Sequence, residues 1–438
     1  MSIKVAKFGG SSLADAAQFR KVKSIMEADP TRLFLVPSAP GKRSYKDEKI
    51  TDLLFRCEKL ASEGGHFEET FDIIAERYIE VAYELNLKID IRAHLKEVWS
   101  NIKNGATADY AASRGEYLNA LLLSDYLGFA FVDAAEVIRF DENGVFDEKE
   151  THALCHKFLH GRGRVVIPGF YGARPDGSIQ VFPRGGSDIS GAIIASGVHA
   201  DVYENWTDVS GFLMADPRIV KGAVPIRTVT YSELRELAYM GATVLHEDSI
   251  FPVRQACIPI NVRNTNEPEE PGTMIVPDSE GGASGGMLTG IAGRRGFTII
   301  AIAKDNMHNE IGFGYNVLSV LKRNNISFEH IPTGIDTMSV VLADSEIEGR
   351  RKQIIDELFA ETKADSIELH DNLALIATVG RGMVRYVGVS AKLFGALARA
   401  GVNIRMIDQG SSEMNIIVGV ESDEFEDAVR AIYHAFKE

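Results

Sequence analysis

The chain of 438 residues has few cysteines, a shortage of positive charge and no long apolar run. Its three cysteines, Cys57, Cys155 and Cys257, lie far apart without metal-ligand spacing, which argues against a disulfide framework and fits a reducing cytosol. The net charge of −15 argues against binding to a nucleic-acid backbone or to an anionic membrane surface. No apolar stretch approaches the roughly 18 residues of a membrane span, and no signal peptide precedes the first strand pattern. We therefore expect a cytoplasmic protein of about two or three domains.

The first 265 residues alternate short apolar stretches with longer helical patterns. Strands are predicted over residues 3–8, 33–36, 165–167 and 179–182, and helices over residues 67–85 and 106–127. This alternation is typical of a layered α/β domain, in which the carboxyl ends of the strands carry functional loops. The sequence therefore predicts a first domain over residues 1–265.

A linker and an internal repeat follow this region. Residues 266–287 contain three prolines and a run of Gly, Ala and Ser, a composition typical of a connection between domains. A shift of 76 positions aligns Gly312 with Gly388 and Ile326 with Val402. Each copy has the order βαββα, and a final strand is less clear in the first copy. We predict two small α+β modules in tandem, over residues 288–368 and 369–438.

The segment Lys7-Phe8-Gly9-Gly10-Ser11-Ser12 directly follows an apolar strand and precedes a helical pattern that starts near residue 14. Two glycines let the backbone turn tightly and bring N–H groups close to an anion, and the next helix adds its partly positive N-terminus. Lys7 supplies a full positive charge where a transferred phosphate would lie. The alternative is an ordinary turn with a solvated lysine, and the segment alone favours neither. It matches neither the Walker pattern nor the dinucleotide fingerprint.

Three further segments carry side chains of chemical interest. A second Gly-Gly turn, residues 182–190, contains Arg184, which can form a bidentate pair with a carboxylate, and Asp188, which would otherwise serve as a helix cap. Residues 207–218 follow a predicted strand over 202–206, where a capped loop explains the polar side chains equally well. Next to Glu116, Gly115 interrupts a helical pattern at a cost of about 1 kcal/mol relative to Ala. Close approach of a ligand would explain that glycine, although most such carboxylates are simply solvated.

Together and in this order, these segments resemble the aspartate kinase branch of the amino-acid kinase family, and the repeat resembles the paired ACT domains of that branch. The resemblance covers essentially the whole chain. It implies a layered α/β/α catalytic domain followed by two βαββαβ, ferredoxin-like ACT modules. It also implies ATP- and Mg²⁺-dependent phosphorylation of the side-chain carboxylate of L-aspartate, the first step of lysine, threonine and methionine biosynthesis.

The resemblance implies a role for each matching residue. Lys7 would stabilise charge on the transferred phosphoryl group, and Asp188 would position Lys7. The substrate side would comprise Ser38, Thr51, Glu116 for the ammonium group and Arg184 for the α-carboxylate. The nucleotide side would comprise Lys7, Gly9, Gly10, Ser11, Thr207, Asp208, Phe212, Asp216 and Arg218.

Two positions depart from the family pattern. Thr243 stands where many relatives have an ATP-binding lysine, so Arg218 or Lys221 would have to compensate. Phe212 stands where a tyrosine is common, which is a milder change.

The ACT resemblance implies feedback inhibition by an end-product amino acid. The positions that match an effector site are Met307, Glu310, Gly312, Phe313, Phe328, Glu329 and Thr333. Either Glu310 or Glu329 would pair with the side-chain ammonium group of lysine, which favours lysine over threonine as the effector. The alternative is that both repeats serve only for dimerisation. Pairing of ACT modules across subunits implies a homodimer or a dimer of dimers.

Two other functions fit parts of the sequence. Another kinase of the same family, acting on glutamate, acetylglutamate or uridylate, is disfavoured by the Arg184 and Glu116 pair and by the tandem repeat. A non-catalytic amino-acid sensor is supported only by Thr243, and the presence of Lys7, Arg184 and Asp188 argues against it.

Overall fold

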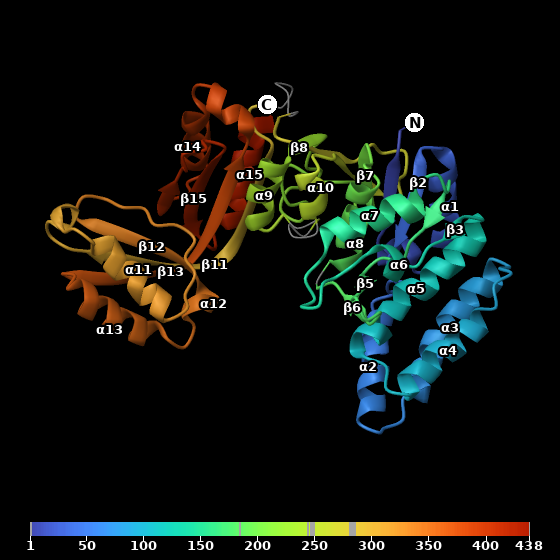
Figure 1. Ribbon diagram of the computed structural model, residues 1–438. Helices are drawn as coiled ribbons and strands as arrows, with labels where there is room; N and C mark the ends of the chain where they lie inside the picture. The colour runs from blue at the N-terminus through green and yellow to red at the C-terminus, as the bar shows by residue number, and fades with distance from the viewer. Residues whose placement is uncertain (1, 184, 243–244, 246–249, 280–285, 438) are drawn as a thin grey trace. The chain divides into compact units, whose positions relative to one another are not determined.

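The computed structural model describes residues 2–183, 185–242, 245, 250–279 and 286–437 (Figure 1). These residues form two compact units. The first comprises the described residues of 2–212, 225–231 and 245–279, and the second comprises residues 213–224, 232–242 and 286–437. Two segments of the predicted first domain, 213–224 and 232–242, thus group with the repeat. Residues 273–276, within the predicted linker, form a strand of the first unit.

Among the described residues, the first unit is built on an eight-stranded sheet with the order β3-β4-β2-β1-β7-β9-β10-β8. Its strands are β1 (Lys4–Phe8), β2 (Arg32–Pro37), β3 (Ala130–Phe131), β4 (Val165–Val166), β7 (Val202–Thr207), β8 (Thr228–Thr230), β9 (Ile260–Asn264) and β10 (Thr273–Val276). All neighbours are parallel except β9 and β10. Because β1 lies between β2 and β7, the carboxyl ends of these three strands meet at one edge of the sheet. A separate two-stranded antiparallel ribbon consists of β5 (Tyr171–Ala173) and β6 (Ile179–Val181).

Helices cover both faces of this sheet (Figure 1). One layer consists of α1 (Ala16–Ala28), α2 (Ile50–Ser62), α3 (Glu68–Glu84), α4 (Ile91–Lys103) and α5 (Ala108–Leu127). Their apolar faces share a core with Phe8 and Trp206. On the other face, α8 (Gly186–Gly197) contacts β1, β2 and β7, and it packs against α7 (Glu148–Leu159) and α10 (Phe251–Gln255). The short elements η1 (Gly10–Leu13) and α6 (Ala134–Val137) complete a layered α/β/α unit.

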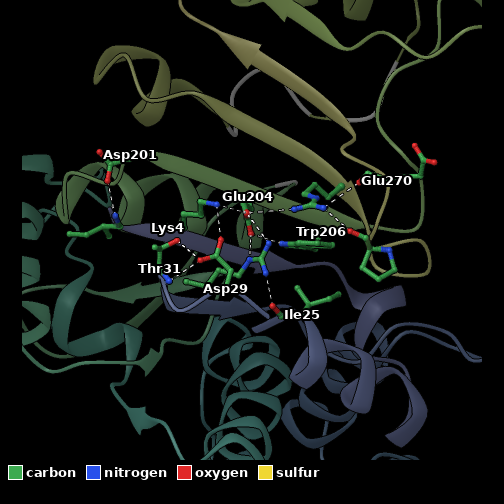
Figure 2. Close-up of polar contacts among 12 residues, drawn as sticks. Lys4, Ile25, Asp29, Thr31, Asp201, Glu204, Trp206 and Glu270 are labelled. Carbon is green, nitrogen blue, oxygen red and sulfur yellow. Dashed lines mark hydrogen bonds and ion pairs between the residues drawn. The ribbon is translucent and has the colours of Figure 1, made fainter. Parts of the chain in front are cut away.

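The core face of this sheet contains a buried ion network around Glu204 (Figure 2). Glu204, 1% exposed, accepts hydrogen bonds from Arg32 Nε at 2.7 Å and from Trp206 Nε1 at 2.9 Å. Its other oxygen accepts from Arg32 Nη2 at 3.2 Å, with Lys4 Nζ at 3.7 Å and Arg263 Nη1 at 4.0 Å. A buried carboxylate is costly unless its hydrogen bonds are made. Both oxygens of Glu204 have partners, so this charge ties four strands together.

The second unit holds both copies of the repeat in one antiparallel sheet with the order β12-β11-β13-β15-β14. Its strands are β11 (Gly290–Ala303), β12 (Thr337–Ala343), β13 (Ser366–Val379), β14 (Met406–Asp408) and β15 (Asn415–Glu421). Its helices are η3 (Met307–Asn309), α11 (Phe313–Arg323), α12 (Asp344–Ile347), α13 (Arg351–Thr362), η4 (Arg381–Arg385), α14 (Val389–Arg399) and α15 (Phe425–Lys437). Helix α9 (Tyr231–Tyr239), apart from its first residue, also belongs to this unit.

The predicted repeat is visible in the helices and the strands. Helices α11 and α14 begin and end 76 positions apart, and each follows a glycine with positive φ, 88° at Gly312 and 93° at Gly388. The unclear final strand of the first copy is the first half of β13, because residues 366–370 pair with the second half of β11. The first half of β11 pairs with the second half of β13. The second copy therefore takes its closing strand from residues 290–295, at the start of the predicted first module.

None of the helices among the described residues has the length and apolarity needed to cross a bilayer.

Candidate active site

Lys7 and Asp188 form an ion pair at the carboxyl edge of the first sheet. The distance from Lys7 Nζ to Asp188 Oδ1 is 2.5 Å. Lys7 lies near the end of β1, and Asp188 lies in the first turn of α8. The lysine is buried, whereas 22% of the Asp188 side chain is exposed. The structure thus brings together the two residues predicted to be catalytic, and leaves one side of the pair open to solvent.

Backbone hydrogen bonds hold the loop after β1. Gly9 N–H donates to the Trp206 carbonyl at 2.9 Å, and Gly41 N–H donates to the Gly10 carbonyl at 2.8 Å. A Cβ on Gly41 would lie 2.5 Å from the carbonyl carbon of Gly10, so this approach requires glycine. The helix predicted near residue 14 begins as the 3₁₀ turn η1, and α1 follows after Asp15, whose side chain caps it by accepting from Gln18 N–H. The exposed Ser11 lies in η1.

A buried arginine that sequence reasoning missed holds the loop over residues 41–48. Arg77 of α3 donates from Nη2 to the Gly41 carbonyl at 2.5 Å and from Nη1 to the Glu48 carbonyl at 3.2 Å. Burial lowers the pKa of Arg77 below its ordinary value, against the opposing effect of Asp47 at 3.5 Å. An arginine in a helical pattern is usually solvated, so no feature of the sequence indicates this role.

Glu116 of α5 is a buried carboxylate with one free oxygen. Ser187 Oγ donates to its Oε1 at 3.4 Å, whereas Oε2 has no hydrogen-bond partner among the described residues. Burial raises the pKa of Glu116 to about 7, although hydrogen bonds from the Ala39 backbone and from Ser187 act in the opposite direction. A Cβ on Gly115 would lie 2.9 Å from that of Ala39, which explains the helix glycine by close packing. An unpartnered buried carboxylate oxygen is an acceptor site for a cationic group.

The other predicted substrate residues lie on the loop after β2 and on α2. Asn119, one turn after Glu116, donates from Nδ2 to the Ser38 carbonyl at 2.7 Å, so α5 also fixes the loop after β2. Thr51 is half-buried in the first turn of α2. Arg184 lies outside the described residues. Sequence reasoning missed Asn119, which is completely buried.

Phe170, after β4 at the same edge of the sheet, has an unusual backbone conformation with a φ of 81°. Its N–H donates to Ser190 Oγ at 2.8 Å, and a Cβ on Gly186 would lie 2.3 Å from its ring. Positive φ in a bulky residue costs energy and is typical of functional sites. Nothing in the sequence signals this conformation.

Comparison with known proteins agrees with this fold. The amino acid kinase family matches residues 2–264, and an ACT domain matches residues 376–436. Aspartokinase 3 of Bacillus subtilis (strain 168) is 36% identical over 450 residues, which cover 99% of this chain and 98% of that protein. The crystal structure of Clostridium acetobutylicum aspartate kinase is 53% identical, with a TM-score of 0.95, and the match covers 99% of this chain and 100% of that one.

The chain belongs to the aspartate kinase branch of the amino acid kinase family. Two crystal structures of E. coli aspartokinase III, each 27% identical and matched over the full length of both chains, agree with this assignment. Their TM-scores are 0.73 for the complex with aspartate and ADP and 0.76 for the complex with lysine and aspartate. The predicted fold class, with an amino-acid-kinase domain and C-terminal ACT modules, is confirmed, and so is the enzyme class.

The nucleotide residues predicted for this aspartate kinase fall in both units. Thr207 and Asp208 stand at the end of β7, and the buried Phe212 donates its N–H to Thr273 Oγ1 at 2.8 Å. Asp216 and Arg218 belong to the second unit, where they form an ion pair of 2.6 Å with the arginine exposed. Thr243 lies outside the described residues.

The predicted effector residues are distributed along η3, α11 and the loop before β12. Met307 and Phe313 are buried, and Gly312 precedes α11. Phe328 is exposed. The exposed Thr333 hydroxyl donates to the Ile331 carbonyl at 3.2 Å.

The two carboxylates predicted to receive the ammonium group of an effector already have cationic partners. Glu310 pairs with Lys304. Glu329 accepts from Arg294 Nη2 at 2.9 Å and from the hydroxyl of Tyr239, at the end of α9, at 2.5 Å. An effector ammonium group would therefore have to share or displace these partners.

Proposed function

We propose that this aspartate kinase transfers the γ-phosphoryl group of ATP to the side-chain carboxylate of L-aspartate, and that Lys7, Asp188 and Glu116 carry the reaction site. The supporting observation is their linkage through two adjacent residues. Ser187 donates to Glu116, and the next residue, Asp188, pairs with Lys7. A buried carboxyl group with a free oxygen and a buried lysine are thus joined by one turn of α8. Such a pair suits a zwitterionic substrate and a triphosphate.

The reaction needs no general base, because the attacking aspartate carboxylate is already ionised at neutral pH. One of its oxygens bonds to the γ-phosphorus while the bond from that phosphorus to the β–γ bridging oxygen breaks, and ADP leaves with the electron pair. The protein's contribution is therefore positioning and charge neutralisation. Lys7 neutralises charge on the transferred group, and Asp188 keeps Lys7 at the edge of the sheet.

The remaining substrate contacts are assigned by chemistry. Glu116 Oε2 takes the ammonium group of aspartate, and Arg184 takes its α-carboxylate. Ser38 and Thr51 are assigned to the same substrate. This division leaves the side-chain carboxylate of aspartate free to attack.

Within the first unit, the nucleotide is held by backbone groups of Gly9, Gly10 and Ser11 and by Thr207, Asp208 and Phe212. Asp216 and Arg218, which belong to the second unit, stay predictions from the family resemblance. The complex of E. coli aspartokinase III with ADP supports nucleotide binding in this chain. No group of three His, Cys, Asp or Glu residues within the described part of the chain is arranged to hold a metal ion. The residues fit Mg²⁺ that enters with ATP, since this ion is usually held by one or two carboxylates and substrate phosphates, and Asp188 offers one carboxylate. The ion would neutralise phosphate charge.

The test is a trapping assay with hydroxylamine, which converts an acyl phosphate into a coloured hydroxamate. ATP, Mg²⁺ and L-aspartate should give hydroxamate, L-glutamate should not, and Lys7→Ala should lose about a thousandfold or more in kcat. Lys4→Ala is the matched control on the same strand, because Lys4 faces the Glu204 network. Retention of activity in Lys7→Ala would contradict the assigned site, and hydroxamate formed with glutamate alone would contradict the substrate.

For regulation, we propose lysine as the feedback effector and ACT-like modules as the subunit interface. The name of the E. coli relative, lysine-sensitive aspartokinase 3, supports the first. The fully exposed, β-branched Ile311 and Val387, which stand 76 positions apart in the two copies, support the second, in a homodimer or a dimer of dimers. Thermal-shift titration should show stabilisation by lysine, and stabilisation by threonine alone would contradict it. Light scattering of the Ile311→Lys and Val387→Lys variants should show dissociation.

A further inference from the structure

Asn205 of strand β7 contacts the Lys7–Asp188 pair. The sequence analysis did not single out this asparagine. Asn205 is buried, and its Nδ2 donates to Asp188 Oδ1 at 2.8 Å. This is the same oxygen that Lys7 Nζ contacts at 2.5 Å. Asn205 stands opposite Lys7 in the parallel β1–β7 ladder, so both side chains project to the α8 face of the sheet.

A second residue of β7 holds the backbone of α8 at the same place. Tyr203, two residues before Asn205, donates its hydroxyl to the Asp188 carbonyl at 3.1 Å. Burial raises the pKa of Tyr203 well above its ordinary value, so the hydroxyl keeps its proton at neutral pH. A Cβ at Gly191 of α8 would lie 2.6 Å from the Tyr203 hydroxyl oxygen, so this glycine permits the close packing. Tyr203 thus fixes the position of the first turn of α8, and Asn205 fixes the carboxylate that projects from it.

We propose that Asn205 is a positioning residue for phosphoryl transfer, which holds the Asp188 carboxylate so that Oδ1 faces Lys7. When a triphosphate binds, Lys7 is attracted by two anions, the phosphate and Asp188. The amide of Asn205 anchors the carboxylate without neutralising it, since an amide donates a hydrogen bond but carries no charge. The inference extends the proposed function, because it rests on the roles assigned there to Lys7 and Asp188.

The first experiment is a double-mutant cycle on kcat in the hydroxamate assay. Asn205→Leu removes the donor at similar volume and should lower kcat on the order of 10- to 100-fold, with the KM for aspartate changed by no more than about threefold. Asp188→Ala should lower kcat further than Asn205→Leu. Adding Asn205→Leu to Asp188→Ala should cost no additional activity, because a residue that acts only through the side chain of Asp188 has nothing left to position. If Asn205→Leu lowered kcat by the same factor in the wild-type protein and in the Asp188 variant, the proposal would be overturned.

The matched control is Asn261→Leu on the neighbouring strand β9. Asn261 stands in register with Glu204, on the opposite face from Asp188, and its Oδ1 has no hydrogen-bond partner among the described residues. This variant should keep the wild-type kcat. A loss in Asn261→Leu equal to that in Asn205→Leu would make the effect one of general strand packing and would also overturn the proposal.

A second variant, Asn205→Asp, tests the same contact through pH if Asn205→Leu does not fold. Among the described residues, the charged or titratable groups placed around position 205 are Lys7 on β1, Asp188 on α8 and Tyr203 on β7, and the β9 residue in register with Asn205 is the apolar Val262. The introduced carboxyl group, when protonated, would still donate to Asp188, whereas its ionised form would repel that carboxylate. The kcat of this variant should therefore fall as pH rises, in a range where wild-type kcat is constant. A parallel pH profile would contradict the proposal. Loss of activity in Lys7→Ala with no change in either Asn205 variant would defeat this inference alone, whereas full activity in Lys7→Ala would defeat the proposed site itself.

Discussion

Glu204 and Glu116 are both buried glutamates of the first unit, yet their surroundings differ in a way that separates structure from function. Glu204, 1% exposed, has partners for both of its oxygens, from Arg32, Trp206, Lys4 and Arg263. Glu116, 5% exposed, accepts one long side-chain hydrogen bond, from Ser187, and its Oε2 has no hydrogen-bond partner among the described residues. A buried carboxyl group whose oxygens both have partners within the protein holds strands together. A buried carboxyl group with an oxygen that lacks a partner is a candidate ligand site.

The largest expected effect on stability comes from Glu204. Glu204→Ala leaves the buried Arg32 without its carboxylate, and loss of one partner of a buried ion pair typically costs about 3–5 kcal/mol. Denaturant unfolding should show this loss, while the folded fraction keeps the wild-type KM for aspartate. The control is Glu80→Ala, because Glu80 forms an exposed pair with Arg43 that is worth about 1 kcal/mol or less. Equal destabilisation of the two variants would remove the distinction between Glu204 and a surface charge.

The opposite pattern is expected at Glu116. Glu116→Gln keeps the shape but removes the charge that pairs with the substrate ammonium group. A charge-assisted hydrogen bond is worth about 1.5–3 kcal/mol, so the KM for aspartate should rise about 10- to 100-fold. Steady-state kinetics should show this rise with the KM for ATP nearly unchanged. An unchanged KM for aspartate would mean that the free oxygen of Glu116 is not the ammonium site.

The same substitution should change how stability depends on pH. Burial raises the pKa of Glu116 from 4.5 to about 7, which corresponds to roughly 3 kcal/mol. Between these two values the folded protein binds more protons at this site than the unfolded chain, so the stability from Glu116 is full below pH 4.5 and is lost as pH rises through 7. Glu116→Gln should therefore gain stability relative to wild type as pH rises. Chemical denaturation at about pH 5 and about pH 8 checks this, and a constant difference between the two proteins would contradict the assigned pKa.

A smaller effect is expected at Arg77, which donates to two backbone carbonyls of the loop over residues 41–48. Arg77→Met leaves these carbonyls without their partner, at a cost of about 1–3 kcal/mol. Amide hydrogen exchange at Gly41 should become faster. Arg92→Met in α4 is the control, since that arginine is exposed. Unchanged exchange at Gly41 in Arg77→Met would show that the loop is held by other contacts.

Patterns with a fixed period predicted the fold well. The stretches predicted at residues 3–8 and 33–36 are β1 and β2, and the 76-residue shift gives the bounds of α14 from those of α11. The shared strands of the second unit could not be predicted, because the sequence of β11 or β13 does not show which strands it pairs with, and only pairing shows that each serves both modules. Likewise, residues 213–224 read as a loop of the first domain, although Ala215 and Val220 pack into the core of the second unit.

Site residues next to a glycine turn could be predicted from the sequence. Site residues that are defined by contacts between distant segments could not. Lys7 and Asp188 each accompany a Gly-Gly turn between a strand and a helix, a local signal that the structure explains by backbone packing. Asn205 lies within a strand, where an asparagine between Glu204 and Trp206 gives no indication of its partner. For Glu116, the only indication in the sequence was the neighbouring Gly115. The burial of the Glu116 carboxylate could not be predicted, because it depends on the loop that packs over the helix.

The most direct test of the contrast between the two glutamates is the number of protons released when aspartate binds. Isothermal calorimetry at about pH 6.5, in two buffers with different ionisation enthalpies, measures it for wild type, Glu116→Gln and Asn261→Leu in the presence of a non-hydrolysable ATP analogue. Glu116 is largely protonated in the free enzyme at this pH and must ionise to pair with the ammonium group. We therefore predict release of a substantial fraction of a proton in wild type and Asn261→Leu, and none from this site in Glu116→Gln. Equal proton release in all three proteins would contradict the assignment of Glu116 as the unsatisfied charge that receives the substrate.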